Sequence, residues 1–234
     1  MKSASLSSKA SSQRGIAVRD LGVMNYGEAL ALQRELRDAR LASDVPDTLL
    51  LVEHPPVYTL GRRSEPSELL VDHEALKASG AQVYEIERGG KITFHGPGQL
   101  VGYPILDLRA LALSVPRYVH LLEQTLINYL ETLSLTAERR RGFPGVWVKG
   151  RKIGAVGVHV KQWVTMHGFA LNLSTDLKAF EAIVACGISD AVVTSVTSEL
   201  GDAPSMAHAK RDIARLFSGL IADEGTSKRP LVER

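Results

Sequence analysis

Apolar residues recur along this chain with two different periods, and these periods predict most of its helices and strands. Apolar positions three or four residues apart, with charges between them, indicate amphipathic helices that pack through one face. Helices are predicted over residues 26–41, 74–78, 116–133, 176–183 and 206–221, of which the short second one rests on Asp72 as N-cap and Gly80 as stop rather than on a period. Ser114 stands just before the third of them, where its hydroxyl would accept a hydrogen bond from the first turn.

Short apolar runs bounded by glycine, proline or polar residues predict the strands. These runs cover residues 16–21, 48–53, 57–60, 82–87, 100–106, 146–148, 153–160 and 164–173. Only tight turns separate the last three strands, at residues 149–151 and 161–162, so we expect these strands to pair antiparallel. Such an irregular order of helices and strands indicates an α+β fold rather than a doubly wound sheet.

No internal repeat, low-complexity linker or shift of composition divides the chain, so we expect one folded domain over residues 15–223. Residues 1–14 are rich in serine and lysine and contain no acid, which predicts a disordered tail. An organellar transit peptide of similar composition is the alternative for this segment. Residues 224–234 have the composition of a loose polar tail.

The composition narrows the class of protein. Of the 234 residues, 44% are apolar and 23% are charged, which is typical of a globular protein with a substantial core. The net charge of +2 is too small to favour nucleic-acid binding, and no run approaches the roughly 20 apolar residues of a membrane helix. The single cysteine excludes an intramolecular disulfide, which favours the cytoplasm, where thiols stay reduced.

The compact basic run from Arg139 to Arg141 has two readings. Such a run is usually a solvated loop, and the alternative is a contact point for an acidic partner such as a carrier protein.

The stretch RGGKITFHGPGQ, residues 88–99, carries the densest chemical signal in the chain. It contains four glycines, which is more than a sharp turn requires. Glycines let a ligand lie close to the backbone and leave N–H groups to face a carbonyl or an anion. The stretch is therefore interpreted either as a glycine-rich turn with a purely structural role or as a ligand-binding loop. His95 closes this stretch, and it would suit either a structural hydrogen bond or acid–base chemistry.

Two further residues have the chemistry of a catalytic pair. Cys186 is followed by a glycine, and a lone cysteine is ordinarily a small buried apolar residue but is otherwise a nucleophile. A free thiol has a pKa of about 8.5, so as a nucleophile it needs a cation or a base beside it. Lys152 opens a predicted strand just after a tight turn, where a lysine is ordinarily solvated. No metal-binding pattern of histidines or carboxylates is present in the sequence.

An ordered set of five motifs, spread over most of the chain, resembles the lipoyl(octanoyl) transferase family. The motifs are EHPPVYTLG at 53–61, RGGKITFHGPGQ at 88–99, KIGAVG at 152–157, HGFALN at 167–172 and CGI at 186–188. Members of that family move an octanoyl or lipoyl group from acyl carrier protein to a lysine of a lipoyl domain, the first step of endogenous protein lipoylation. The resemblance implies a central mixed, largely antiparallel sheet flanked by helices, as in biotin and lipoate protein ligases.

The resemblance also implies roles for individual residues. The family's cysteine, which matches Cys186, carries the acyl group as a thioester, and its lysine, which matches Lys152, lies against that cysteine. Three segments are implied to bind the acyl substrate, and their residues are Arg88, Gly89, Gly90, Lys91, Ile92, Thr93, Phe94, His95, Ala155, Val156, Gly157, Gly168, Phe169 and Ala170. Backbone N–H groups near Gly89, Gly90, Gly157 or Cys186 are candidates to stabilise the tetrahedral oxyanion.

The partners that the resemblance implies are octanoyl-acyl carrier protein, the lipoyl domains of 2-oxoacid dehydrogenase complexes, and the glycine cleavage H protein. No cofactor, metal, nucleic acid or membrane is implied, and we expect a monomer. Two small departures from the family pattern, Ala185 and Gly154, bear on local geometry and remove no reacting group. Two alternatives stay open: an ATP-dependent lipoate or biotin ligase, and a binding module that has lost catalysis.

Overall fold

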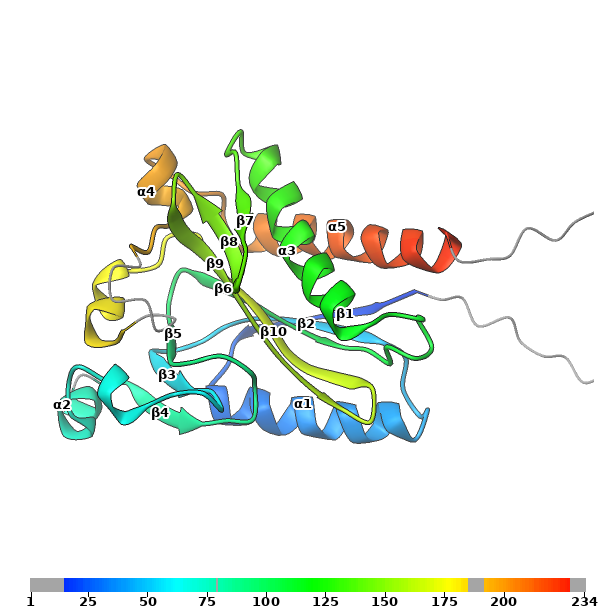
Figure 1. Ribbon diagram of the computed structural model, residues 1–234, viewed down its shortest axis with the longest axis horizontal. Coiled ribbons are helices and arrows are strands. Elements are labelled where there is room, and N and C mark those ends of the chain that lie inside the picture. The colour runs from blue at the N-terminus through cyan, green and yellow to red at the C-terminus, as the bar shows by residue number, and fades with distance from the viewer. Residues whose placement is uncertain (1–14, 79, 185–191, 228–234) are drawn as a thin grey trace, which may run out of the picture.

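The computed structural model describes residues 15–78, 80–184 and 192–227, and its centre is a seven-stranded mixed sheet (Figure 1). The strands lie in the order β1 (Ala17–Val23), β2 (Thr48–Glu53), β6 (Gln99–Ile105), β10 (Val164–Asn172), β9 (Arg151–Lys161), β8 (Phe143–Val148) and β7 (Glu138–Arg140). β1 pairs with β2 in parallel, and the other neighbours pair antiparallel. The expected antiparallel pairing of β8, β9 and β10 is therefore confirmed.

Helices pack on both faces of this sheet. α3 (Val115–Thr132) and α5 (Met206–Ser227) cover one face, and α1 (Tyr26–Leu41) covers the other (Figure 1). Ser114 caps α3 as expected, since its side chain accepts a hydrogen bond from the backbone N–H of Arg117. No helix among the described residues has the length and apolar composition needed to cross a membrane.

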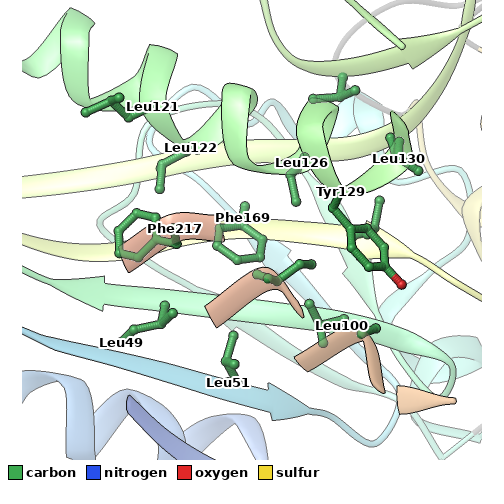
Figure 2. Close-up of a cluster of buried hydrophobic side chains, with 14 of the residues drawn as sticks. Leu49, Leu51, Leu100, Leu121, Leu122, Leu126, Tyr129, Leu130, Phe169 and Phe217 are labelled. Carbon is green, nitrogen blue, oxygen red and sulfur yellow. The ribbon is translucent and has the colours of Figure 1, made fainter. Parts of the chain in front are cut away.

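The continuous apolar run of β2 follows from its place between these two layers. Leu49 and Leu51 pack against α3 and α5, whereas Leu50 and Val52 pack against α1. A strand buried on both faces needs apolar residues at successive positions, because its side chains alternate between the faces. Figure 2 shows the first layer, where leucines of α3 point toward Phe169, Phe217, Leu49, Leu51 and Leu100.

A smaller sheet lies beside the large one and carries the glycine-rich stretch. Its order is β4 (Gln82–Glu85), β3 (Val57–Leu60) and β5 (Thr93–His95), and β3 is parallel to β4 and antiparallel to β5. The short helix α2 (His73–Ala78) and the 3₁₀ turns η1 (Pro66–Glu68) and η2 (Leu177–Ala182) accompany it. A third apolar cluster holds this part together, with Tyr58, Leu76 and Phe94 among its members.

Several boundaries differ from the sequence-based expectations. The second hairpin turns at Gln162 and Trp163, which both have positive φ, rather than at 161–162. α4 (Val196–Leu200) is a further short helix that was not predicted. α5 continues to Ser227, past the start of the expected polar tail, and Glu224 near its end forms an ion pair with Arg117 of α3.

The basic run around Arg139 forms the edge strand β7 instead of a solvated loop. Arg139 donates from Nε to Glu123 of α3 at 3.0 Å, and the guanidinium of Arg140 lies 5.2 Å from the ring centroids of both Phe143 and Trp147. Two of the three arginines therefore contact the protein itself, Arg139 on α3 and Arg140 on β8, with which β7 pairs antiparallel.

Candidate active site

A cavity of about 370 Å³ lies between the two sheets. Every predicted acyl-binding residue except Phe94 lines it, and so does Lys152: the lining includes Arg88, Gly89, Gly90, Lys91, Ile92, Thr93, His95, Ala155, Val156, Gly157, Gly168, Phe169 and Ala170. Phe94 is the exception, because its ring turns away to pack on Tyr58 and Phe180 at centroid distances of 5.1 and 5.6 Å. Three segments far apart in the sequence thus meet around one space.

Small residues face one another across β9 and β10 along the cavity. Ala155 pairs with Ala170, and Gly157 pairs with Gly168. A Cβ at Gly157 would lie 3.1 Å from Arg88 Cδ, and one at Gly168 would lie 2.3 Å from the backbone oxygen of Gly102. These two glycines therefore let neighbouring protein atoms approach closely, as glycines within strands commonly do. The small side chains of Ala155 and Ala170 project little into the cavity.

The glycine-rich loop is held by its own arginine. Arg88 is buried and donates from Nη1 to the carbonyl of Lys91 at 2.7 Å, and from Nη2 to Thr59 O and Oγ1 at 2.7 and 2.8 Å. Gly89 N donates to Val158 O at 2.9 Å, which anchors the loop on β9. Of the candidate oxyanion donors near Gly89, Gly90, Gly157 and Cys186, the Gly89 N–H is therefore already bonded in this conformation.

The direction of Lys152 depends on an irregularity in strand pairing. β8 and β9 pair as Trp147 with Lys152 and then as Val146 with Gly154, so the register shifts by one residue around Ile153. Such a bulge changes which side chains share a face. Ile153 accordingly packs in the core beneath α3, while Lys152 lines the cavity together with Ala155 and Gly157. Regular alternation would have turned Lys152 toward the core.

The Lys152 side chain is buried and directed by polar and aromatic contacts. Its Nζ donates to the carbonyl oxygen of Pro144 at 3.0 Å and lies 5.4 Å from the ring centroid of Trp147. Gly145 has φ +132, and a Cβ there would lie 2.7 Å from Lys152 Cε. Lysine is rarely buried, so Lys152 is not the solvated lysine that is ordinary beside a tight turn.

Two neighbouring histidines, His95 in the cavity wall and His54 behind it, are neutral and hydrogen-bonded within the protein. His54 Nδ1 lies 2.7 Å from the carbonyl oxygen of Met24, which makes it the donor, and Nε2 therefore accepts from the Tyr103 hydroxyl at 2.8 Å. Burial lowers the pKa of His54 to about 4. Burial, followed by the nearby His54, likewise lowers the pKa of His95 to about 3.

The arrangement around His95 favours its structural role. Gln99 Nε2 donates to the carbonyl of Phe94 at 3.2 Å and to Asn172 Oδ1 at 2.8 Å, so Gln99 Oε1 accepts from His95 Nδ1 at 2.7 Å. A group with a pKa near 3 is a weak general base at neutral pH. Asn172 continues the network by donating to Thr194 O at 3.0 Å.

Cys186, the predicted nucleophile, lies outside the described residues, and the chain on both sides of that segment is described. Val184 N donates to Glu68 O at 2.8 Å on one side. On the other side, Lys152 N donates to Val192 O and Thr194 N donates to Lys152 O, both at 2.9 Å. Within the described ranges, no three His, Cys, Asp or Glu side chains gather as metal ligands.

Several cavity residues gave no signal in the sequence. Tyr26 begins α1, Tyr103 lies in β6, and Val119 lies in α3. Each occupies an apolar position of a regular element and is indistinguishable there from a core residue. His167 has positive φ and also lines the cavity, and its backbone N–H donates to Gln33 Oε1 at 2.9 Å. Only the tertiary arrangement brings Tyr26, Tyr103 and Val119 to the site, whereas His167 begins the HGFALN motif.

Comparison with solved structures places the fold. A lipoate-protein ligase A bound with ATP superposes with a TM-score of 0.72 at 16% identity, over 91% of this chain and 92% of that one. The biotin protein ligase from Aquifex aeolicus in complex with biotin and ATP gives a TM-score of 0.55 at 13% identity, over 88% and 71% of the two chains. The expected α+β fold, with a mixed sheet flanked by helices, is thus confirmed.

Sequence relatives identify the family. Residues 25–218 match the model of the lipoyl protein ligase A/B catalytic domain. An octanoyltransferase from Mycolicibacterium smegmatis is 52% identical over 192 residues, 80% of each chain, and one from Geobacter sulfurreducens is 47% identical over 204 residues, 87% of this chain and 84% of that one. The chain therefore belongs to the octanoyltransferase family, within the lipoyl protein ligase A/B catalytic-domain family.

Proposed function

We propose that this protein transfers an octanoyl group from octanoyl-acyl carrier protein to the acceptor lysine of lipoyl domains, through a thioester on Cys186. The observation that carries the proposal is the buried ammonium of Lys152 at the wall of an acyl-sized cavity, in a chain about half identical to octanoyltransferases. Lipoyl domains of 2-oxoacid dehydrogenase complexes and the glycine cleavage H protein are the proposed acceptors. We further propose a cytoplasmic monomer.

The cavity is suited to a medium-length acyl chain. Its volume of about 370 Å³ lies near the lower end of the range for small-molecule sites, roughly 300–1,000 Å³. Ile92, Val156 and Phe169 line the cavity with apolar side chains, and the small side chains of the alanine pair on β9 and β10 leave space for the acyl chain. Burying the chain's methylene groups would contribute about 0.8 kcal/mol each.

In the first step, the Cys186 thiolate attacks the carbonyl carbon of the octanoyl thioester. The bond from that carbon to the pantetheine sulfur breaks, and Lys152 passes a proton to the departing sulfur. The Lys152 ammonium would also favour the thiolate before attack, since a nearby cation lowers the pKa of a thiol. Exchange of one thioester for another is close to isoenergetic, so a cysteine suits this step better than a serine.

In the second step, the amine of the acceptor lysine attacks the enzyme thioester. Lys152, neutral after the first step, accepts the proton that the incoming amine must lose, and the Cys186 thiolate leaves. The product is an amide, and amide formation from a thioester is strongly downhill. Lys152 thus regains in the second step the proton that it gave up in the first. The acyl group that entered on Cys186 leaves as the amide.

The ATP-dependent ligase is the second candidate function. Its support is the likeness in fold to lipoate-protein ligase A, but at 16% identity that likeness concerns the fold alone. The relatives that share about half of their residues with this chain are octanoyltransferases. Transfer without nucleotide is therefore the preferred proposal.

Turnover with and without nucleotide tests the proposal. The protein is mixed with octanoyl-acyl carrier protein and an unmodified lipoyl domain, and the mass of the lipoyl domain is followed over time. We expect octanoylation in the absence of ATP. Modification only when ATP and free octanoate or lipoate are supplied would favour the ligase, and no modification under either condition would favour a binding module.

A further inference from the structure

We propose that Glu123, a buried carboxylate of α3 outside the cavity, positions the Lys152 ammonium through a single peptide group. The inference rests on the proposed function, because it concerns how Lys152 is held for its work on Cys186. Glu123 does not line the cavity and is not among the acyl-binding segments, so its proposed role is to position Lys152 rather than to contact a reacting group.

Glu123 is fixed on both oxygens of its carboxylate. Oε1 accepts the backbone N–H of Gly145 at 2.9 Å, and Oε2 accepts Arg139 Nε at 3.0 Å. Arg139 is held in turn by Gln124 Oε1 at 2.7 Å and the carbonyl of His120 at 3.2 Å. Since α3 contributes several fully buried side chains to the core, among them Leu122 and Leu126, the carboxylate stands on a firmly packed helix.

The peptide group between Pro144 and Gly145 connects Glu123 to Lys152. Its N–H donates to Glu123, and its carbonyl oxygen, on the Pro144 side, accepts from Lys152 Nζ at 3.0 Å. A peptide group is planar, and in its trans form the N–H and C=O point in opposite directions. An acceptor that fixes the direction of the N–H therefore also fixes where the carbonyl points, and so where the ammonium is held.

The charges at the two ends of this peptide strengthen the connection. A carboxylate at the N–H and an ammonium at the C=O polarise the peptide in the same sense, and hydrogen bonds to ionised groups are stronger than neutral ones. Gly145 also allows the approach itself, because a Cβ there would lie 2.4 Å from Gly154 O and 2.7 Å from Lys152 Cε. Without the N–H acceptor, the peptide and the lysine above it would lose their fixed orientation.

The proposal predicts in which direction the apparent pKa of the Cys186 thiol changes when Glu123 is replaced. Loss of the Glu123 charge by itself would favour a nearby thiolate and lower the apparent pKa of Cys186. Loss of the Lys152 position would raise that pKa toward the value of a free thiol, about 8.5. Among the described residues, the charged groups in contact around this position include Arg139, Arg140 and Lys152, together with Glu123 itself.

Glu123→Gln and Glu123→Met form the matched pair for the test. Both remove the charge at similar side-chain size, but glutamine keeps an oxygen acceptor for Gly145 N–H and methionine does not. The readout is the rate of alkylation of the chain's single cysteine by iodoacetamide as a function of pH, fitted to an apparent thiol pKa. We expect Glu123→Met to raise this pKa by about one unit and Glu123→Gln to leave it unchanged or lower.

Four further variants separate the possible causes. Arg139→Met leaves the Gly145 contact in place and should leave the thiol pKa unchanged. The Glu123 pair is repeated in the Arg139→Met background, where no unpaired guanidinium can disturb folding. Lys152→Met tests the proposed function separately: if it leaves the thiol pKa unchanged, the Lys152 role fails whatever Glu123 does.

The positioning role of Glu123 is overturned by either of two results while Lys152→Met does shift the pKa. The first is an equal pKa for Glu123→Met and Glu123→Gln in both backgrounds. The second is a shift in Arg139→Met as large as that in Glu123→Met, which would indicate general loosening of β7 and β8.

Discussion

Lys152 and Ile153 are adjacent in the sequence, yet Ile153 packs in the core under α3 while Lys152 turns into the cavity, with Nζ 3.0 Å from Pro144 O. Neighbouring residues of a strand face opposite ways, and the one-residue shift in the pairing of β8 with β9 decides that Lys152 rather than Ile153 faces the cavity. This irregularity of the sheet therefore directs one charged side chain, that of Lys152, toward the site.

Lys152→Arg should separate the two halves of the proposed reaction. Arginine keeps a positive charge beside the thiol, and the pantetheine sulfur can leave as a thiolate that solvent then protonates, so enzyme acylation by the octanoyl donor should be slowed only modestly. A guanidinium does not give up its proton in proteins, so transfer to the acceptor lysine should fall by about 100-fold or more. Rapid-quench measurement of each half-reaction checks this. Equal losses in both halves would contradict the proton-accepting role.

Gly168→Ala should destabilise the fold, since the new Cβ would lie 2.3 Å from the backbone oxygen of Gly102. We expect a loss of about 1–3 kcal/mol in the free energy of unfolding, measured by urea denaturation. Gly157→Ala should cost less, because its nearest neighbour is the Arg88 side chain at 3.1 Å. Gly219→Ala is the control, since no atom lies within 4 Å of a Cβ on this exposed residue of α5. Equal effects at Gly168 and Gly219 would count against the close backbone approach.

Ala155→Leu should shift the acyl preference toward shorter chains. Ala155 lines the cavity opposite Ala170, so a leucine there would occupy space proposed for the acyl chain. A single methylene in such a pocket discriminates by about 10-fold or more. We expect kcat/KM for octanoyl donors to fall by about 100-fold and that for butanoyl donors to change much less. A uniform loss for both donors would argue that Ala155 does not contact the chain.

The sequence predicted the site segments better than it predicted the directions of their side chains. The bounds of α1, β2 and β3 agree with their apolar patterns, because each is a regular element with a clear period. A period of two would have placed Lys152 on the same face as Gly154, and nothing local indicates the bulge that prevents this. Glu123 lies on the apolar helix α3, where its contact with Gly145 depends on a strand 22 residues away.

The loops show the same division. The glycine-rich stretch predicted that another group would lie close to its backbone, and the Gly89 N–H does donate to the carbonyl oxygen of Val158 in β9. The partner strand could not be named, since it comes from a segment some seventy residues later in the chain. Phe94 fits the motif as well as its neighbours do, yet it packs on Tyr58, because alternation along β5 turns it to the opposite face.

Stability should decline in acid partly because of His54. Its pKa is lowered from 6.5 to about 4 in the folded protein, so the unfolded chain binds a proton that the folded one does not. The contribution of neutral His54 to the free energy of unfolding is fully present above about pH 6.5 and is lost as the pH falls toward 4. It amounts to about 3 kcal/mol. His54→Gln should reduce the slope of unfolding free energy over that range, whereas His208→Gln, at an exposed position, should not. An unchanged slope in His54→Gln would contradict the assignment.

The most direct test of the central claim is to trap the acyl-enzyme. The protein is incubated with octanoyl-acyl carrier protein without ATP, and its intact mass and peptide map are recorded. The proposed mechanism predicts an octanoyl increment on the Cys186 peptide that neutral hydroxylamine removes, that Cys186→Ala abolishes, and that an unmodified lipoyl domain discharges. Octanoylation of the lipoyl domain without any adduct on the enzyme, or with Cys186→Ala fully active, would contradict the thioester intermediate.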